Sequence, residues 1–557
     1  MSRILAQLLY NRGMTDPNDA YNFLFADDLN VGSLLAIRGK RHSIDRALAR
    51  VRQAIRAGEL IVVYGDFDAD GVTSTTLLVE TLKALGAKVA PYIPHRVDEG
   101  YGVNVPALLE LSRRGAKLVI TVDCGIRSVE EVEEGKAFGL DIIVTDHHSL
   151  GPELPKAYSV INPKCDDCQY NEDMLAGVGI AYRFAEALLT ISGAANGKNG
   201  NGQAHFSPDN LLDLVAIGTV ADLAPLNRLE NRVLVKRGLA VINQTKRMGL
   251  RALAEVAQIK FGAIDAGTIG FGIGPRINAA GRLDTAMTAY ELLSTGDANR
   301  AGQLAVRLQT LNLQRQELTR AAQDLIRDRI EDVEGTPLIF ASDRNFQPGI
   351  VGLVAGRLTE EFFRPTVVME EGDTESRASC RSIPQFDITR ALDECASLLV
   401  RHGGHAQAAG FTILNENIPE FKEKLMGIAR SALRGQDLLP TLEIDMEVDA
   451  AEISIDLALE LQKLEPTGHM NPAPILLTRN LRVMEARTVG QKDQHLKLRL
   501  GRQGLPPLDA IGFNLAAEWG SRLGDYVDVV YQLEINEWNG NKSAQLRLMD
   551  TKGAGSW

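Results

Sequence analysis

The chain has 557 residues, of which 45% are hydrophobic, 24% charged and 5% aromatic. A single hydrophobic core stops growing near ~250–300 residues, so this length predicts about three domains, and the apolar content excludes a disordered or fibrous chain. Lys and Arg number 60 against 72 Asp and Glu, a net charge of −12. This balance argues against a protein that coats duplex DNA through bulk positive charge. It leaves room for a local basic channel and for a site rich in carboxylates.

The location of the protein is constrained by what the sequence lacks. No run of ~18 apolar residues is present, so we expect no membrane span, and we expect no secretory signal at the N-terminus. The five cysteines are an odd number spread along a long chain, unlike a disulfide framework. The expected location is a reducing cytoplasm.

The first elements predict a helical segment followed by an α/β domain. Residues 1–58 are polar and helical in pattern. From residue 59 to about residue 300, short apolar runs alternate with helical stretches, the pattern of βαβ units on a parallel sheet covered on both faces. The runs are Ile61–Tyr64, Lys117–Val122 and Asp141–Thr145. A Gly- and Asn-rich segment, residues 193–203, is predicted to be a surface loop.

The second half predicts a long helix and two further domains. Residues 301–333 read as one helix, roughly 45 Å long at ~1.5 Å per residue, and we expect it to link two domains. A smaller α/β domain is predicted at residues 334–436, with helices at 350–359 and 387–400. Residues 437–557 alternate apolar and polar residues, and their Asn539-Gly540 pair favours a hairpin turn. They predict a small antiparallel β-barrel.

Carboxylate and imidazole side chains follow the predicted strands of the first α/β domain. They are Asp66, Asp68 and Asp70, then Asp123, then Asp146, His147 and His148, and, after a fourth apolar stretch, Asp222. The carboxyl ends of parallel strands share one edge of the sheet, where ligands bind in open α/β folds. We therefore expect these side chains to converge at equivalent points of the sheet.

Such a cluster predicts metal ions. Converging carboxylates repel one another unless cations neutralise them. Asp with neutral His is a ligand set suited to Mn²⁺, Mg²⁺ or Zn²⁺. Five or six ligands exceed what one catalytic ion uses, so we infer two ions. Two ions ~3.5–4 Å apart are the standard arrangement for cleaving phosphate esters with activated water.

Other interpretations of the same motifs are weaker. The segment from Asp66 to Gly71 resembles the start of an EF-hand loop, but its twelfth position is Leu77, where a bidentate Glu is required, and a predicted strand precedes it. A single Asp at a strand end is usually a turn former, and a solitary His-His pair is usually a surface or core feature. Four such groups in one domain favour the metal centre.

The ordered motifs resemble a known superfamily. Asp-x-Asp-x-Asp-Gly, Val-Asp-x-Gly, Asp-His-His and Gly-Thr-Val-Ala-Asp, in that order, resemble the DHH phosphoesterases. Residues 95–102, 274–282 and 401–410 are similar to the RecJ family of bacterial 5′→3′ exonucleases specific for single-stranded DNA. The resemblance covers nearly the whole chain. It implies an α/β fold class: a parallel-sheet DHH domain joined by a long helix to a smaller α/β DHH-associated domain, then an antiparallel β-barrel of the OB-fold type.

The resemblance also implies the chemistry. It implies an exonuclease that degrades single-stranded DNA from the 5′ end to mononucleotides, in repair and recombination, with two Mn²⁺ ions, or Mg²⁺ in their place. The implied metal ligands are Asp66, Asp68, Asp70, Asp123, His147 and Asp222. We assign Asp146 to orienting its neighbours and His148 to the charge that develops on the scissile phosphate.

Substrate-binding positions are carried over in the same way. They are Arg96, Tyr101, Arg276, Asn278, Ser379, Arg381, His402, Gly403, Gly404 and His405. A guanidinium is expected to bind phosphate and a Tyr ring to stack on a base. The serine, arginine and glycines of the DHH-associated domain are expected to form a pocket for the 5′-terminal phosphate, because glycines let backbone N–H groups approach an anion. The two histidines could instead be a metal pair, but no carboxylate motif accompanies them.

Two departures and several partners complete the expectations. Gln347 stands where family members usually have His, a change that affects a substrate contact and not the metal site. Cys165 and Cys168 form a lone CxxC without a second pair, so zinc is not expected there. The expected partners are single-stranded DNA, a helicase and a single-strand-binding protein, for a chain that works as a monomer and without a membrane.

Two alternative functions stay open. One is a nanoRNA or cyclic-dinucleotide phosphodiesterase of the same superfamily, although residues 442–557 form an extra domain that those enzymes lack. The other is a non-catalytic replication-fork scaffold, which is disfavoured because every ligand position is filled.

Overall fold

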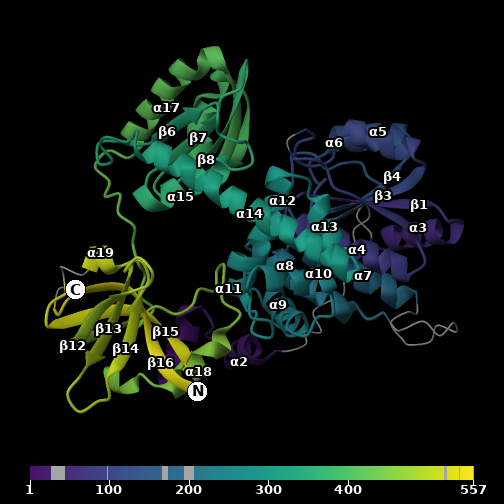
Figure 1. The fold of residues 1–557 in the computed structure, drawn as a ribbon. Coiled ribbons are helices and arrows are strands. Elements are labelled where there is room, and N and C mark those ends of the chain that lie inside the picture. The colour runs from purple at the N-terminus through teal and green to yellow at the C-terminus, as the bar shows by residue number, and fades with distance from the viewer. Residues whose placement is uncertain are drawn as a thin grey trace. The chain divides into compact units, whose positions relative to one another are not determined.

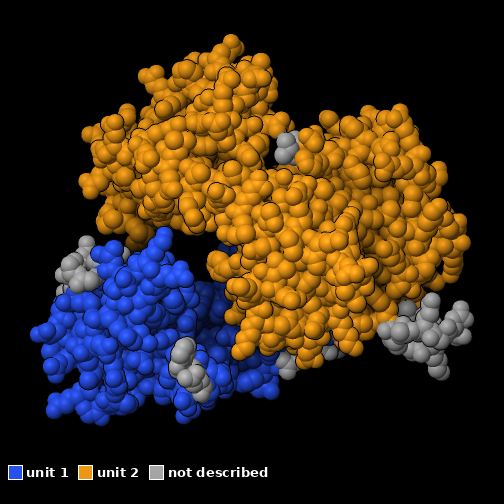
Figure 2. All heavy atoms as spheres, in the orientation of Figure 1, with its two compact units in different colours: residues 1–31, 223–237, 441–557 blue, residues 32–222, 238–440 orange. Residues whose placement is uncertain are grey.

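The chain forms two compact units (Figure 2). Unit 1 contains residues 1–31, 223–237 and 441–557, and unit 2 contains residues 32–222 and 238–440. The computed structural model describes residues 1–26, 44–96, 98–165, 174–192, 206–519, 523–538 and 540–555. The predicted surface loop at residues 193–203 and Asn539 of the predicted hairpin turn lie outside the described residues. Among the described helices, none is long and apolar enough to cross a membrane.

A parallel five-stranded sheet forms the centre of the first domain of unit 2 (Figure 1). Its strands lie in the order β2-β1-β3-β4-β5. They are β1 (Leu60–Gly65), β2 (Lys88–Tyr92), β3 (Ala116–Val122), β4 (Asp141–Thr145) and β5 (Ser159–Ile161). The three predicted strands are β1, β3 and β4, which are neighbours in the sheet, so the prediction of a parallel sheet is confirmed.

Helices cover both faces of this sheet, which is why its strands are almost continuously apolar. One face packs against α4 (Ala69–Ala84) and α7 (Gly177–Ile191), and the other against α5 (Val105–Arg113) and α6 (Val129–Ala137). The N-terminal part of unit 2 also contributes α3 (Ile44–Ala57), which packs near β3 and β5.

A helical region follows the sheet. Its elements are α8 (Leu212–Ala221), α10 (Met248–Val256), α11 (Ala266–Thr268), the π-helical turn η4 (Ile269–Ile273), α12 (Gly274–Leu283) and α13 (Met287–Ser294), while α9 (Leu229–Ile242) spans residues of both units. The apolar stretch before Asp222 is the buried helix α8, so the expectation that Asp222 follows the sheet at an equivalent point is wrong. A helix buried on all sides gives the same continuous apolar run as a buried strand.

The long helix α14 (Ala298–Arg327) has 30 residues. It begins after Asp297, whose side chain accepts a hydrogen bond from the backbone N–H of Arg300 at 3.0 Å. It packs on α10, α12 and α13 and, farther along, on α15 (Val351–Phe362). The predicted linking helix is thus present, although it ends a few residues earlier than predicted.

The second α/β domain of unit 2 has a mixed sheet in the order β6-β7-β8-β10-β9. Its elements are β6 (Ile339–Asp343), β7 (Thr366–Glu370), β8 (Glu375–Arg381), β9 (Leu399–His405) and β10 (Ala408–Leu414), with α15, α16 (Ile388–Glu394) and α17 (Ile418–Ala432). The predicted helix at 387–400 is wrong beyond residue 394. There the chain turns into β9, because pairing with β10 overrides the local pattern.

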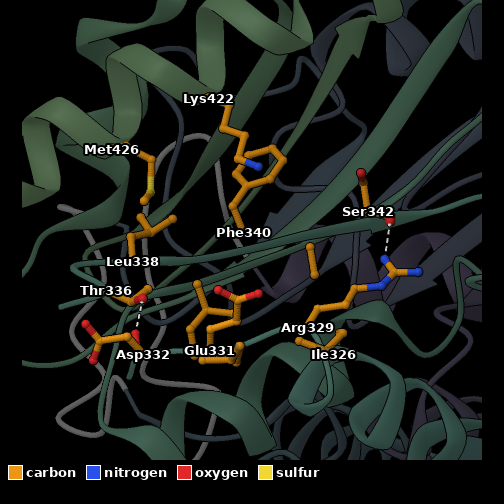
Figure 3. A pocket seen from close by; sticks show the side chains of 13 residues that line it. Ile326, Arg329, Glu331, Asp332, Thr336, Leu338, Phe340, Ser342, Lys422 and Met426 are labelled. Carbon is orange, nitrogen blue, oxygen red and sulfur yellow. Dashed lines mark hydrogen bonds between the residues drawn. The ribbon is translucent and has the colours of Figure 1, made fainter. Parts of the chain in front are cut away.

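A surface cavity of about 540 Å³ lies where the chain after α14 meets β6 and α17 (Figure 3). The ammonium group of Lys422 lies 5.4 Å from the centroid of the Phe340 ring. Arg329 donates to the carbonyl of Ser342 and pairs with Asp343. None of the predicted site residues lines this cavity.

Unit 1 contains the predicted barrel. Its five strands are β12 (Leu476–Val489), β13 (His495–Gly501), β14 (Leu508–Gly512), β15 (Tyr526–Trp538) and β16 (Asn541–Gly553). The pairing of β12 with β15 closes the sheet into a barrel. The remaining elements are α1 (Arg3–Asn11), α2 (Pro17–Phe25), β11 (Met446–Glu447), α18 (Ile455–Leu461) and α19 (Ala516–Trp519). The barrel is confirmed, with one parallel pair, β14 and β16, among antiparallel ones.

One buried arginine joins the three chain segments of unit 1. Arg232 donates to the carbonyl of Phe23 at 2.6 Å and to the carbonyls of residues 463–466. Its guanidinium lies 3.9 Å from the centroid of the Phe23 ring. The planar fork of five donors allows one side chain to bind several carbonyls at once.

Candidate metal centre

Three neighbouring strands place the predicted acidic residues at one edge of the sheet. Asp66 follows β1, Asp123 follows β3 and Asp146 follows β4. Asp68 begins α4, and its side chain accepts hydrogen bonds from the backbone N–H groups of Asp70 and Gly71 at 2.9 and 3.0 Å. The loop after β1 thus leads directly into α4, so the carboxylates of Asp66, Asp68 and Asp70 lie close together along the chain.

Glycines make this tight convergence feasible. A Cβ atom on Gly71 would lie 2.4 Å from the carbonyl oxygen of Asp66. A Cβ atom on Gly177 would lie 2.7 Å from the Cβ atom of Asp123. Both positions therefore exclude any larger residue without displacement of the backbone that carries the carboxylates.

The ligand atoms come within reach of common centres. Among the described residues, three groups have ligand atoms within 4.8 Å of one another: Asp66 with Asp68 and Asp123, Asp70 with His147 and Asp222, and Asp123 with His147 and His148. The Nε2 atom of His147 lies 3.0 Å from Oδ1 of Asp123, 3.8 Å from Oδ2 of Asp222 and 3.9 Å from Oδ2 of Asp70. The structure therefore brings all six predicted ligands together.

Several of these atoms are buried and make no hydrogen bond of acceptable geometry, although Asp123 and His147 face each other at 3.0 Å. They are Oδ1 of Asp66, Oδ1 of Asp123 and Nε2 of His147. A buried polar atom without a partner costs roughly 1–3 kcal/mol, and native proteins rarely leave one without a reason. Lone pairs that face one another at this spacing are what a divalent cation satisfies. The residues present therefore fit a metal centre.

Burial and repulsion between neighbouring carboxylates also shift the pKa values of these residues. Burial, together with the neighbouring Asp68, raises the pKa of Asp70 to about 7. Burial and the charge of Asp70 raise the pKa of Asp222 to about 9, and burial raises the pKa of Asp123 well above its usual value. Burial lowers the pKa of His147 to about 3, so its imidazole is neutral and its lone pair is free to bind a cation.

Asp70 is also fixed by the start of α7. Its two carboxylate oxygens accept the backbone N–H groups of Gly177 and Val178 at 2.7 and 2.8 Å. N–H groups at a helix N-terminus favour an anion. This contribution was not predicted, because the sequence around Gly177 has only an apolar helical pattern.

Asp146 and His148 form a hydrogen-bonded pair beside the ligands. Oδ1 of Asp146 lies 2.8 Å from Nδ1 of His148 and accepts the backbone N–H groups of both histidines, while Oδ2 accepts that of Ile126. Burial alone would raise the pKa of Asp146, but the hydrogen bond from His148 lowers it. Burial alone would lower the pKa of His148, but Asp146 raises it. The pair therefore favours a carboxylate and an imidazolium.

A cavity of about 520 Å³ opens beside this pair. Tyr101, His148, Lys164 and His405 are among its lining residues, and the Tyr101 hydroxyl lies 3.3 Å from both ring nitrogens of His148. Lys164 donates to the carbonyl of His147 at 2.6 Å. Lys164 was missed by sequence reasoning, since it follows β5, a strand of 3 residues that leaves little pattern.

Arginines gather near the carboxylates without pairing to them. Burial lowers the pKa of Arg282 to about 10, and the neighbouring charges of Arg96 and Arg315 act in the same direction, with a smaller effect from Arg381. Burial lowers the pKa of Arg315, and the charges of Arg357 and Arg276 also lower it. Like charges gathered in this way create a local positive potential.

Three of these arginines were not predicted from the sequence. They are Arg282, Arg315 and Arg357. Arg282 is the last residue of a motif already noted, and its guanidinium donates to the carbonyl of Gly349 at 3.0 Å. The other two lie in ordinary helical sequence on α14 and α15, where no spacing distinguishes them.

Three predicted substrate residues are arginines with uncharged partners. Arg381 donates to Oγ of Ser379 at 3.2 Å, and Arg276 donates to Gln309 and to the carbonyl of Gly272. Arg96 lies over the Phe67 ring at 4.7 Å. These guanidiniums keep donors available for phosphate.

Other predicted side chains are already engaged. Oδ1 of Asn278 accepts the backbone N–H of Ala69 at 2.7 Å, so this side chain supports the acidic loop. His402 pairs with Asp393 at 2.9 Å. Gly403 and Gly404 lie in β9, and a Cβ atom on Gly404 would lie 2.3 Å from a carbonyl oxygen of β10. Among the described residues, no metal-binding group includes His402 or His405.

Two departures from the family pattern were noted in the sequence, at Gln347 and at the Cys165 and Cys168 pair. Gln347 is exposed. Cys165 is buried, and Cys168 lies outside the described residues.

Models of known families match three parts of the chain. The DHH family N-terminal domain matches residues 60–219, the DHHA1 domain matches residues 335–431 and the RecJ OB domain matches residues 444–550.

Curated relatives match almost the whole chain. It is 37% identical over 552 residues to the "Single-stranded-DNA-specific exonuclease RecJ" of Bacillus subtilis, a match that covers 98% of this chain and 67% of that protein. It is 35% identical over 520 residues to the protein of the same name from Escherichia coli, covering 90% of this chain and 89% of that one.

Solved structures agree in fold. A crystal structure of RecJ in complex with Mn²⁺ from Thermus thermophilus superposes with a TM-score of 0.82 at 32% identity, covering 99% of this chain and 76% of that one. A structure of RecJ with Mg²⁺ from the same organism gives a TM-score of 0.76 at 31% identity, covering 99% of this chain and 75% of that one.

Proposed function

The chain belongs to the RecJ family of single-stranded-DNA-specific exonucleases, and on that premise we propose that it degrades single-stranded DNA from the 5′ end to mononucleotides with two divalent cations. It is a metal-dependent exonuclease that acts on single-stranded DNA. The 5′ polarity, the number of ions and the preference for Mn²⁺ over Mg²⁺ are parts of the proposal.

The observation that carries the proposal is the set of buried ligand atoms without hydrogen bonds. The residues that would hold the ions, because their ligand atoms form overlapping groups, are Asp66, Asp68, Asp70, Asp123, His147 and Asp222. Bound there, divalent cations supply Lewis acidity to the scissile phosphate and activate the attacking water. Asp123 and His147 each belong to two groups, which favours two neighbouring ions over one.

The residues around the ligands have their own roles in this proposal. Asp146 holds the His148 ring by its Nδ1 atom, and the raised pKa of His148 keeps a positive charge beside the cavity. That charge stabilises the negative charge that develops on the phosphate. The exposed ring of Tyr101, close to His148, stacks on a base. Stacking of this kind is indifferent to sequence, so we expect little base preference.

The direction of cutting comes from the arginines gathered around Arg282. Arg381 and Ser379, with the neighbouring charges of Arg282 and Arg315, form a site for a terminal phosphate. A strand anchored by its 5′ phosphate presents the next phosphodiester bonds to the metal centre in order, which makes the cutting directional. In the cell, we propose a cytoplasmic role in DNA repair and recombination, alongside a helicase and a single-strand-binding protein, with the chain acting as a monomer.

The test uses the metal-free chain and defined substrates. After treatment with EDTA, the protein receives Mn²⁺ or Mg²⁺ and single-stranded DNA labelled at either end. Early release of labelled mononucleotides from the 5′-labelled strand only, with duplex DNA untouched, supports the proposal. Early release from the 3′ label contradicts the polarity. Cleavage of dinucleotides alone indicates the phosphodiesterase function, and no cleavage of either substrate indicates the scaffold.

A further inference from the structure

Phe271 is the most exposed large hydrophobic side chain among the described residues of unit 2. Its ring is 90% exposed. The other exposed aromatic ring described in that unit is Tyr101, at 58%, which borders the metal centre. Single exposed aliphatic residues are common on protein surfaces, but an aromatic ring held almost entirely in water gains nothing for stability.

The local backbone holds this ring outward. Phe271 lies between Gly270 and Gly272 in the π-helical turn η4, which continues directly into α12. A Cβ atom on Gly272 would lie 3.1 Å from a side-chain atom of Ile259. The two neighbours of Phe271 therefore contribute no side chain that could cover the ring. π-helical turns inside helices occur frequently at functional sites.

The same segment borders the metal centre. A Cβ atom on Gly270 would lie 3.8 Å from Val220, and one on Gly274 would lie 3.3 Å from the Cβ atom of Ala221, the residue before Asp222. Farther along α12, Asn278 accepts the backbone N–H of Ala69 beside Asp68. Phe271 thus lies at the Asp222 end of the helical segment that packs along the carboxylate cluster.

An arginine expected to contact the substrate is tied to the same turn. Arg276 donates to the carbonyl of Gly272 at 2.6 Å, which ties its guanidinium to the turn that carries Phe271. It also donates to the uncharged side chain of Gln309. An exposed aromatic ring beside an arginine whose partners are uncharged is the combination that binds a base and its phosphate in single strands.

We propose that Phe271 is a second stacking platform, on which one base of the substrate strand rests while Tyr101 contacts another. The proposal rests on the proposed function and extends it to a residue on the Asp222 side of the centre. The ring touches the substrate and not the reacting atoms, so it contributes to binding of the strand and not to the hydrolysis step.

The experiment combines a variant with a base deletion. The wild-type chain, Phe271→Ala, Phe271→Trp and Phe271→Leu are compared on single strands in which one abasic site is moved stepwise from the 5′ end. Met248→Ala, which removes another exposed apolar side chain of unit 2, is the matched control. KM and kcat are measured with Mn²⁺, and circular dichroism checks the fold.

The expected result has a position dependence. Phe271→Ala raises KM roughly 5- to 20-fold with kcat unchanged, the scale of one lost stacking contact. Phe271→Trp keeps the wild-type KM, and Phe271→Leu falls between. In the wild type one position of the abasic site raises KM by the same factor, and at that position Phe271→Ala adds nothing further.

Two failures are distinguishable. The stacking platform is contradicted if Phe271→Ala and the wild type have equal KM on an intact strand. It is also contradicted if the effects of the variant and of the abasic site on KM multiply at every position of that site. Neither result contradicts the exonuclease activity. A wild-type chain that does not cut single strands with any divalent ion overturns the proposed function itself.

Discussion

Two acidic clusters of unit 2, each with buried carboxylates, differ in their partners. In the structural cluster, Asp213 is 1% exposed and accepts hydrogen bonds from Thr245 at 2.9 Å and from Arg247 at 3.1 Å. Arg247 also binds Glu80 at 2.6 Å. In the metal cluster, buried oxygens of Asp66 and Asp123 have no hydrogen bond. The first cluster is complete within the protein, and the second is not.

The difference shows how function is recognised among buried charges. A buried ion pair is satisfied by its own partners, and removing one partner leaves an uncompensated charge. A buried carboxylate without a partner is costly, and in the metal cluster an external cation would compensate the clustered negative charges. Arginines follow the same division, since Arg247 is paired with acids while Arg381 is hydrogen-bonded to Ser379 and a backbone carbonyl.

The largest expected effect on activity comes from a mutation in the metal cluster. Asp123→Ala removes a carboxylate that belongs to two of the candidate metal groups, so turnover should fall by at least ~10³-fold, of the order of losing an electrostatic contact to the transition state. In EDTA the variant should unfold at the same or a higher temperature than wild type, because a repelling charge is gone. Degradation assays and thermal melts measure both. Wild-type turnover would remove Asp123 from the ligand set.

The second prediction concerns the effect on stability of a mutation in the structural cluster. Asp213→Ala leaves Arg247 with a buried, partly uncompensated charge and should lower the free energy of unfolding by about 3–5 kcal/mol. Activity per folded molecule should stay near wild type, since Asp213 belongs to no candidate metal group among the described residues. Denaturant melts and assays on the folded fraction test this. An inactive but fully stable variant would mean that the two clusters are not separate in function.

The third prediction concerns the arginines without acidic partners. Arg381→Ala should reduce the preference for a 5′-phosphorylated over a 5′-hydroxyl strand by about 10-fold, the scale of one charge-assisted hydrogen bond. Arg377→Ala, an arginine on the same strand β8, is the control and should leave the ratio unchanged. The ratio of kcat/KM for the two substrates is the measurement. An unchanged ratio for Arg381→Ala contradicts its role at the terminal phosphate.

The fourth prediction concerns the pH dependence of the stability of the metal-free protein. The folded-state pKa values of Asp70 and Asp222 are raised to about 7 and about 9, so between about pH 4 and pH 9 the folded state holds more protons than the unfolded chain. The stability of the metal-free protein should therefore fall as pH rises through this range. Saturating Mn²⁺ replaces those protons and should flatten or reverse the trend. Melting curves across pH with EDTA or Mn²⁺ decide, and a stability that rises with pH in EDTA contradicts the assignment.

The strands and their acidic ends were predictable because each carries a local signal. The runs that became β1, β3 and β4 are continuous, and an acidic residue follows each at once. Their adjacency in a parallel sheet then follows from general rules of such folds. The acidic candidates at the strand ends could be collected from the sequence for this reason, whereas the six-ligand set was implied by the family resemblance.

The rest depends on packing that no local pattern encodes. Asp222 ends a buried helix and reaches the same centre through tertiary packing, so the resemblance marked it as a candidate ligand while the sequence pattern gave the wrong element. The predicted helix ends at residue 394, and after a short 3₁₀ turn the chain pairs with β10 from Leu399 onward. Arg315 and Arg357 come from two separate helices, and only the folded chain brings their charges near each other.

The carboxylates of the metal cluster, two of which have buried oxygens without a hydrogen bond, are proposed to hold two divalent cations. Anomalous diffraction from crystals of the full chain soaked in Mn²⁺ tests it most directly. Two peaks are expected in contact with Asp123, one shared with Asp66 and Asp68 and one shared with His147. A single peak would contradict the two-ion centre, and an absence of peaks there, with Mn²⁺ bound elsewhere or nowhere, would contradict the metal centre altogether.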